Sequence, residues 1–533
     1  MQSGALSTKR RFEATSPIPA WCTMRVPGFE DILSRGFFPK ELPPEFSSKA
    51  FASALLPTDA ALATSKPATA QLLVHNLARV GAVRRMIGIP NPLMYARLVK
   101  GVVQNWSKLY KHIAFTGHFS VSRPSADKRS RAIGPSLSFR SLAEQKARVR
   151  ARGKYLLVAD IAECYRSTYT HAIAWALHGK SIAKAAKRDE TLVGNALDKL
   201  ARNAQDGQTN GIPIGPDTSL VLSEVVLASV DRAILRTMKR LNGIRYYDDY
   251  EFTFASKAEA EECLAALSEH AAAFGFHLSP TKTRIVPLPE PLAPPWRAAI
   301  RDFDLRVENS RTHRLIPFFD IVFAYKNKDL GSGIIAYAIK RVEREKWSKN
   351  HWALLQTLLC QAVNAEPSAV DRFVLLLSRA RKSGRELNEE QLAETLAGIV
   401  LDHAPARHSS EVAWALRGLI MLNQHLDKRV VKAVVKMDDP ITSILLLDAR
   451  QAHLTPRQSS FDSVEKRVDD SELYGPHWLL AYEARHKGWA GTDISEPFFA
   501  GLSAKSVSFY SSMQPGAALP ITRIPGPVDY SLF

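Results

Sequence analysis

The chain has 533 residues, of which 46% are hydrophobic, and it carries 71 basic and 53 acidic side chains, a formal net charge of +18. This hydrophobic content excludes an intrinsically disordered chain, and 27 glycines and 31 prolines are too few for a fibrous protein. The length predicts two to four globular domains. The four cysteines lie far apart without a CxxC pair, so we expect neither a disulfide framework nor a zinc site formed by them.

The N-terminal region is polar at its start and strongly basic as a whole. The tract to about residue 25 lacks the apolar core of a signal peptide, and no run of 18 apolar residues follows, so we expect a cytoplasmic protein without membrane contact. Residues 1–150 carry 23 basic and 8 acidic side chains. Such a concentration of positive charge is typical of proteins that bind the phosphates of nucleic acids or nucleotides, although a solvated basic surface is the simpler alternative.

Residues 152–286 alternate between strand and helix patterns. Short apolar and aromatic runs predict three strands and longer patterns predict two helices: strands at 155–159, 244–247 and 250–254, and helices at 171–186 and 219–239. The last two strands flank a tight Asp248-Asp249 turn. This order of elements is typical of an α+β domain.

A proline-rich run separates this region from a helical one. Five prolines lie between Pro287 and Pro295, and because proline fixes φ and removes a backbone donor, we expect a domain edge there. Beyond residue 340 the pattern changes to successive amphipathic helices, one of which begins after the N-cap residue Asn388. We expect a helical-repeat-like domain, although the sequence shows no fixed period.

Two histidines of this helical region, His403 and His408, lie five residues apart. A structural or catalytic zinc site needs at least three protein ligands. No third ligand is apparent nearby in the sequence, so we predict no zinc site here.

Three aspartates suggest a chemistry. Asp160 ends a predicted buried strand, and Asp248 and Asp249 stand at the tip of a predicted hairpin. Carboxylates on a rigid sheet edge are what two Mg²⁺ ions need for in-line phosphoryl transfer, one activating the attacking hydroxyl and the other stabilising the leaving pyrophosphate. A lone Asp-Asp pair is more typical of a solvated turn, so the surrounding pattern decides between the two interpretations.

The motifs around these aspartates resemble those of reverse transcriptases. Residues 246–249, Tyr-Tyr-Asp-Asp, resemble the YxDD box, and residues 160–165 resemble the first palm motif, an aspartate followed five positions later by an aromatic residue. Residues 208–219 resemble the glycine-rich motif before the palm helix, and residues 278–283 resemble the LxxxKT segment after the catalytic hairpin. The order and separation of the four motifs agree with this family.

Stretches outside the polymerase core resemble one group, the abortive-infection reverse transcriptases of bacterial defence. They are residues 36–44, 169–180, 411–416 and 478–483. This resemblance spans roughly residues 28–490 and implies a right-hand fingers-palm polymerase of α+β class followed by an all-α helical-repeat-like domain. The boundaries we predict are an N-terminal extension at 1–25, fingers and palm at 26–290, a linker at 291–340, the helical domain at 341–500 and a tail at 501–533.

The resemblance assigns catalytic roles residue by residue. It implies that Asp160, Asp248 and Asp249 hold two Mg²⁺ ions, with Mn²⁺ as a substitute. Lys282 would protonate the leaving pyrophosphate or pair with it, with a structural lysine at a helix end as the alternative.

The resemblance also assigns nucleotide-binding roles. Tyr165 would pack under the sugar and obstruct a 2′-hydroxyl, which favours deoxynucleotides. Arg131 would neutralise the triphosphate, because a guanidinium fork suits phosphate geometry, and Lys128 and Arg129 are its rivals for that part. The backbone of the glycine-rich motif would approach template and nucleotide at Gly211, Pro213 and Gly215.

The expected function is therefore DNA synthesis from dNTPs in antiphage defence. Pro213-Ile214-Gly215 stands where many polymerases have Pro-Gln-Gly, and this group is associated with protein-primed and untemplated synthesis. The partners implied are dNTPs, a DNA product that can be covalently attached, a noncoding RNA as a candidate, and further copies of the chain in a homo-oligomer. The hydroxyls considered as primers belong to Tyr95, Tyr110, Tyr169, Tyr474, Tyr510 and Tyr530.

Two alternatives remain open from the sequence. The first is a conventional reverse transcriptase, retron-like or intron-like, that copies an RNA from a nucleic-acid primer. The second is a scaffold that binds RNA without catalysis. The missing glutamine and the long helical region argue against the first, and the retention of three clustered carboxylates argues against the second.

Overall fold

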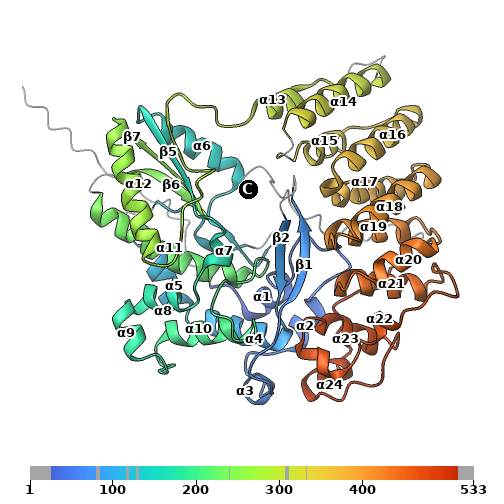
Figure 1. The fold of residues 1–533 in the computed structure, drawn as a ribbon, viewed down its shortest axis with the longest axis horizontal. Helices are drawn as coiled ribbons and strands as arrows, with labels where there is room; N and C mark the ends of the chain where they lie inside the picture. Colours follow the sequence, from blue (N-terminus) through green and yellow to red (C-terminus); the bar gives the residue numbers. More distant parts are fainter. Residues whose placement is uncertain are drawn as a thin grey trace, which may run out of the picture.

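The computed structural model describes residues 26–79, 84–115, 119–127, 131–238, 241–305, 311–329, 331 and 333–513. The predicted N-terminal extension and most of the predicted tail lie outside them, as do Lys128, Arg129 and Tyr530. Among these residues, helices outnumber strands (Figure 1). Within the described part of the chain, no helix is both long enough and apolar enough to cross a membrane.

The central sheet has four antiparallel strands in the order β6-β7-β5-β8. Their bounds are β5 Tyr155–Asp160, β6 Asn242–Tyr246, β7 Asp249–Phe254 and β8 Arg284–Pro287. The first three agree closely with the strands predicted from sequence. β8 was not predicted, because it is a short segment at the start of the proline-rich run, and it forms only by pairing with β5.

Alternation along β7 assigns each face of the sheet to a different helix. Tyr250, Phe252 and Phe254 point into the main core, on the side covered by α12 (Lys257–Ala272). Glu251, between them, points to the opposite face and pairs with Lys146 and Arg150 of α6 (Phe139–Arg150) at 2.6 and 3.0 Å. Because successive side chains of a strand face opposite ways, one strand places both helices.

Helices predicted around the sheet are present with altered bounds. The pattern predicted at 219–239 is α11 (Asp217–Thr237). The single helix predicted at 171–186 is two helices, α8 (His171–His178) and α9 (Lys180–Ala185). Gly179 separates them with a φ of 85°, a left-handed conformation that favours glycine and interrupts a helix.

The N-terminal half adds several short elements, some of which contact α11 and others of which contact α4 or α8. They are the helices α1 Phe29–Arg35, α2 Lys49–Ala54, α3 Ala61–Thr64, α4 Pro92–Gln104, α5 Trp106–Ile113, α7 Cys164–Ser167 and α10 Val193–Asn203, and the strand pair β3 Pro124–Ala126 and β4 Ile133–Pro135. A second hairpin, β1 (Leu73–Ala78) with β2 (Arg84–Ile89), stands between the sheet and the C-terminal helices (Figure 1).

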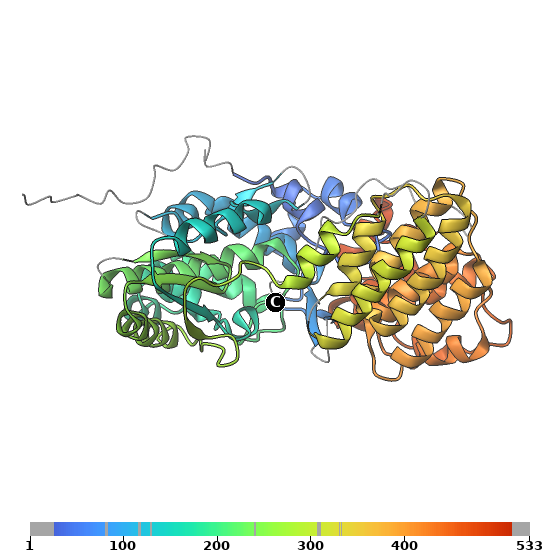
Figure 2. The same ribbon diagram turned by 90° about the horizontal axis from the view of Figure 1, so that it is seen from above.

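The described residues beyond β8 form helices and no further named strand. The helices are α13 Pro295–Asp302, α14 Arg311–Lys328, α15 Ile334–Val342, α16 Lys349–Ala365, α17 Val370–Lys382, α18 Glu389–His403, α19 Ser409–Met421, α20 Lys428–Val435, α21 Pro440–Gln451, α22 Asp462–Glu465, α23 Trp478–His486 and α24 Pro497–Ala504. From α13 to α21 each helix contacts the next but one, so odd-numbered and even-numbered helices form two adjacent rows (Figure 2).

The end of the helical region returns to the N-terminal segment. Phe46 forms a bridge with Tyr510, the Ser47 N–H donates to the Phe509 carbonyl at 2.9 Å, and the Ser511 N–H donates to the Glu45 carbonyl at 2.9 Å. Beside them Phe37 stacks on Trp478 with ring centroids 6.3 Å apart. Three stretches that carry the family resemblance also meet here, because the Trp414 indole N–H donates to the Glu41 carbonyl at 2.9 Å.

A buried ion pair supports this junction. Arg417 of α19 is fully buried, and its Nε donates to both carboxylate oxygens of Glu45 at 3.1 and 3.0 Å. We expect Glu45→Gln to lower the free energy of unfolding by about 3 kcal/mol, because it leaves the Arg417 charge buried without a partner.

The measurement is urea unfolding followed by tryptophan fluorescence. The matched control is the double variant Glu45→Gln/Arg417→Met, which removes both charges and should lose less stability than Glu45→Gln alone. Equal losses in the two variants would contradict a role for the ion pair.

Candidate active site

The sheet brings the three predicted aspartates together. β5 ends at Asp160 and β7 begins at Asp249, and these two residues are paired in the antiparallel register. Asp248 stands in the turn between β6 and β7, where its carbonyl accepts a hydrogen bond from the Ile161 N–H at 3.2 Å. Adjacent strand ends therefore hold three carboxylates at one sheet edge.

Burial and mutual repulsion perturb these carboxyl groups. Burial, with the neighbouring charge of Asp160, raises the pKa of Asp248 to about 6. Burial, with the charges of Asp248 and Asp160, raises the pKa of Asp249 to about 8. Raised carboxyl pKa values of this kind mean that the site lacks balancing positive charge and favours the binding of cations.

Lys282 contacts the three carboxylates through Asp160. Its Nζ lies 2.8 Å from Asp160 Oδ2, and its side chain is half exposed. The segment that carries it is fixed to the end of β5, because the Ser279 N–H donates to the Asp160 carbonyl at 2.7 Å and Ile161 bridges to Leu278. The spacing of the 278–283 motif therefore delivers a lysine to the carboxylates.

The hairpin turn is held from behind by Arg245, which the sequence analysis did not identify. Arg245 is fully buried and forms ion pairs with Glu224 at 2.8 Å and Asp231 at 2.7 Å, both buried residues of α11. Its Nη1 also donates to the Tyr247 carbonyl at 2.8 Å. The sequence did hold one signal for Arg245: a charged residue inside an aromatic strand. Buried charges are rare unless they are paired, so such a residue indicates buried acidic partners.

The backbone of Tyr247 is strained. Its φ is 55°, in the left-handed region where the first residue of such a hairpin turn is usually glycine. Its N–H donates to Ser122 Oγ at 2.7 Å, and Ser122 in turn donates to Glu224 at 2.8 Å. Hydrogen bonds at both the N–H and the carbonyl of Tyr247 offset a strained conformation of the kind that is concentrated at functional sites.

Tyr165 lies beside the cluster, on the corner that follows β5. It packs partly buried against the main core, and burial, with Cys164 and Asp248 nearby, raises the pKa of its hydroxyl. Its carbonyl accepts a hydrogen bond from the Ile212 N–H at 2.8 Å, which joins the corner to the glycine-rich motif. The predicted sugar-packing role is compatible with this position.

The glycine-rich motif approaches other parts of the protein closely. At Gly211, with a φ of 85°, an added Cβ would lie 3.0 Å from the Arg166 carbonyl. At Gly215, with a φ of 132°, it would lie 3.0 Å from Pro39. Pro213 packs against Gly88 of β2, whose N–H donates to the Ile214 carbonyl at 3.0 Å. These contacts fasten the motif to the β1–β2 hairpin.

Arg131, predicted to neutralise the triphosphate, is hydrogen-bonded to protein groups in this structure. Its Nε donates to Asp217 Oδ1 at 2.6 Å, Nη1 to the Phe38 carbonyl at 2.6 Å, and Nη2 to the Gly215 carbonyl at 2.7 Å and the Gly36 carbonyl at 3.2 Å. The guanidinium is thus occupied by the fold. It fixes the glycine-rich motif to the N-terminal segment.

Arg79, just after β1, and Arg85 of β2 lie near enough to the carboxylates for their charges to interact. Burial and the neighbouring Arg85 lower the pKa of Arg79, while the charges of Asp248 and Asp160 oppose this shift. Arg85 likewise acts to lower the pKa of Asp248. Because Arg84 and Arg85 are successive strand residues, they point to opposite faces, and Arg84 pairs with Glu411 of α19.

Residues 85–312 match the family model described as reverse transcriptase (RNA-dependent DNA polymerase). The chain contains a reverse transcriptase domain. The domain match includes Asp160, Asp248, Asp249 and Lys282, and it ends at the start of α14. The more specific defence group has no support from this match.

Other comparisons add little. No curated protein matches the chain. A solved structure of telomerase from Candida albicans, in complex with the TWJ fragment of telomeric RNA, is 10% identical with a TM-score of 0.29. That match covers 65% of this chain and 66% of the telomerase chain, slightly less than two thirds of it.

Arg245 gives a stability prediction. We expect Arg245→Met to lower the free energy of unfolding by roughly 3–5 kcal/mol, because Glu224 and Asp231 become unpaired buried carboxylates. The triple variant Arg245→Met/Glu224→Gln/Asp231→Asn should recover part of the loss. Urea unfolding measures both, and a triple variant no more stable than Arg245→Met would argue against the charge network.

The aspartate cluster gives a prediction about pH. In the unfolded chain Asp248 and Asp249 lose their protons near pH 3.8, but in the folded protein only at about 6 and about 8. The folded state therefore binds more protons in between, and the free energy of unfolding should fall as the pH rises from about 4 to about 8.

Thermal unfolding in a chelator, compared between wild type and Asp249→Asn, measures this effect. We expect a flatter pH dependence in the variant, because the shifted carboxyl group is gone. Parallel pH profiles for the two proteins would refute the assignment.

Proposed function

We propose that the protein is a DNA polymerase that joins dNTPs by phosphoryl transfer at Asp160, Asp248 and Asp249. The observation that carries this proposal is the set of three carboxylates, two with raised pKa values, at paired strand ends inside a reverse transcriptase domain. A scaffold that only bound RNA would gain nothing from such unbalanced acids, and their repulsion would cost stability.

The residues present fit a pair of divalent metal ions. Three carboxylates offer hard oxygen donors of the kind that Mg²⁺ and Mn²⁺ prefer, and the raised pKa values indicate a shortage of positive charge. Ions bound there would activate the attacking 3′-hydroxyl and stabilise the pyrophosphate that leaves. Lys282 would hold the pyrophosphate or protonate it, from its position on Asp160.

Arg79 and Arg85 take the triphosphate role in this proposal. Their position opposite Asp248 suits phosphate oxygens that would lie between the hairpin and the carboxylates. Tyr165, on the corner after Asp160, would pack under the deoxyribose and exclude a 2′-hydroxyl. The glycine-rich motif at Gly211, Pro213 and Gly215 would line the template side.

We further propose protein-primed synthesis in antiphage defence, with the product DNA attached to the chain. Its support is the resemblance to the abortive-infection group. Two of the tyrosines considered as primers have hydroxyls that are engaged inside the protein. Tyr95 is buried and donates to the Gly36 carbonyl, and Tyr510 is buried and donates to Asp448. Among the described tyrosines considered, Tyr110 and Tyr169 are half-buried, and so is Tyr474, whose hydroxyl donates to Glu496 at 3.0 Å. Untemplated synthesis, a noncoding RNA partner and a homo-oligomer belong to the same proposal.

A second candidate is conventional copying of RNA from a nucleic-acid primer. The observation in its favour is the family match, whose description is RNA-dependent DNA polymerase. The two candidates share the carboxylate chemistry and differ in what supplies the first hydroxyl.

One experiment separates these proposals. The purified protein is incubated with Mg²⁺ and each labelled dNTP or rNTP, without template or primer, beside Asp248→Ala/Asp249→Ala. We expect dNTP label that stays on the protein in a denaturing gel, is released by nuclease, and is absent from the variant. Incorporation only with an added RNA template and DNA primer would favour conventional copying. No incorporation under either condition would refute the polymerase.

The hairpin arginines are tested by steady-state kinetics. We expect Arg79→Ala and Arg85→Ala each to raise the KM for dNTP roughly tenfold, because each removes a charged hydrogen bond to phosphate. The matched control is Arg188→Ala, an exposed arginine outside the site, which should leave KM unchanged. An unchanged KM in both hairpin variants would contradict the assignment.

A further inference from the structure

Two histidines and a glutamate converge at the junction of α18 and α19. His403 is the last residue of α18, His408 directly precedes α19, and Glu411 lies in the first turn of α19. The Nδ1 atoms of the two histidines are 2.8 Å apart, and each lies 3.9 Å from Glu411 Oε1. Glu411 was not predicted as a third ligand, although it lies only three positions after His408.

The loop between the two helices is shaped to bring these groups together. The His408 N–H donates to the His403 carbonyl at 3.1 Å, and Arg407 adopts a left-handed φ of 53°. The Arg407 carbonyl also accepts a hydrogen bond from Asn76 of β1 at 2.9 Å. The loop is therefore held at both ends, and the two imidazole rings have fixed positions.

The facing Nδ1 atoms are unusual for two histidines that serve only to pack. A hydrogen bond between them needs a proton on one Nδ1 atom and a lone pair on the other, so one proton lies between the two Nδ1 atoms. Glu411 beside them is buried, with 3% of its side chain exposed, and adds a carboxylate oxygen. Two ring nitrogens and one carboxylate oxygen within 3.9 Å of one another are a donor set that zinc sites use.

We propose that His403, His408 and Glu411 bind a transition metal ion, and that Zn²⁺ fits the three ligands best. Bonds of about 2.0–2.1 Å in a tetrahedral site place ligand atoms roughly 3.3 Å apart. The observed separations of 2.8 and 3.9 Å lie on either side of this value, so shifts of well under 1 Å complete the geometry. Among the described residues, this is the group of three or more His, Cys, Asp or Glu side chains whose ligand atoms all lie within 4.8 Å of one another.

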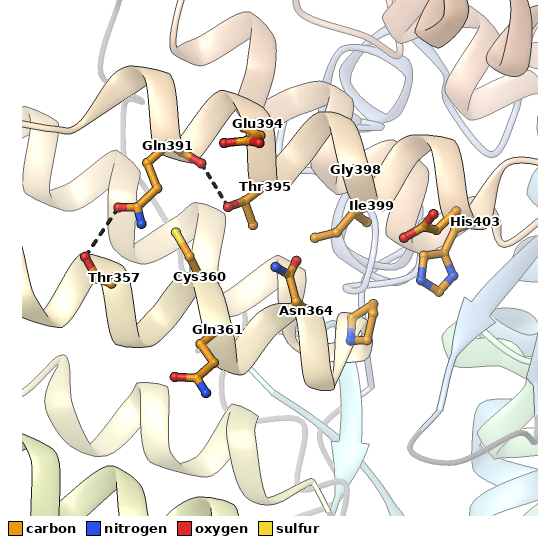
Figure 3. Close-up of a pocket in the computed structure, with 12 residues that line it drawn as sticks. Thr357, Cys360, Gln361, Asn364, Gln391, Glu394, Thr395, Gly398, Ile399 and His403 are labelled. Carbon is orange, nitrogen blue, oxygen red and sulfur yellow. Dashed lines mark hydrogen bonds between the residues drawn. The ribbon is translucent and has the colours of Figure 1, made fainter.

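An ion can reach this position from solvent. His403 and His408 are 20% and 28% exposed. His403 also stands at one end of a cavity of about 710 Å³ between α16 and α18, lined by polar residues that include Asn364, Gln391 and Glu394 (Figure 3). The fourth ligand would then be water from this side.

Arg84 competes with the metal ion for Glu411. Its Nη1 contacts Oε1, the oxygen nearest the histidines, and its Nη2 donates to Oε2 at 2.7 Å. A bound ion would take over Oε1 and leave Arg84 with Oε2 alone. Removal of the arginine should therefore strengthen metal binding, which a purely structural histidine pair does not predict.

The test is titration of the metal-free full-length chain with Co²⁺, whose visible absorption reports tetrahedral coordination. The chain carries Asp248→Ala/Asp249→Ala so that the palm does not bind the ion. We expect one Co²⁺ per chain, displaced by Zn²⁺. His403→Ala and His408→Ala should each weaken binding at least tenfold, while Arg84→Met should tighten it.

The matched control is His425→Ala, an exposed histidine just beyond α19, which should leave the affinity unchanged. Glu411→Gln keeps the shape of the third ligand and removes its charge, so it tests the site even if an alanine variant fails to fold. Absence of the absorption band in the parent chain would overturn the proposal. So would a Co²⁺ affinity in Glu411→Gln and both histidine variants that equals the affinity of the parent chain. Because the palm aspartates are replaced throughout, the result does not depend on polymerase activity.

Discussion

The buried guanidinium of Arg245 is the constraint on which the candidate active site depends. It joins two carboxylates of α11 to the carbonyl of Tyr247, and so ties the long helix under the sheet to the hairpin turn that carries Asp248 and Asp249. Burying these charges costs solvation energy, which the network offsets only while every partner stays in place. A turn held this way keeps its strained backbone, and the carboxylates stay close despite their repulsion.

The β1–β2 hairpin connects the aspartate cluster to the C-terminal helices. Arg84 and Arg85 lie on opposite faces of it: Arg84 pairs with Glu411, and the charge of Arg85 acts on Asp248. Further contacts fasten β1 to the helices: the Ala78 N–H donates to Ser410 Oγ at 3.1 Å, and the buried His75 lies 3.5 Å from Asp439. Helices α19 and α21 thus support this hairpin, although both lie outside the matched segment.

The sequence could predict the parts of the site that depend on local pattern. Asp160 follows an apolar run and Asp249 precedes an aromatic run, so both were predicted beside strands, and antiparallel pairing brings them together. It could not predict the use of Arg131, because its partner Asp217 is 86 residues away and a count of basic residues does not reveal partners. Strand β8 and the role of Arg85 were missed for the same reason, since both are defined by what they face across the fold.

The contacts between residues 45–47 and 509–511 also constrain the order in which the chain can fold. The backbone groups of Glu45 and Ser47 pair with residues 509–511, which the ribosome makes much later. At about 5–20 residues per second, the N-terminal segment waits roughly half a minute or longer for its partner. Phe37 and Glu45 would spend that interval without Trp478 and Arg417, so the contact between the N-terminal segment and the last helices forms late in folding.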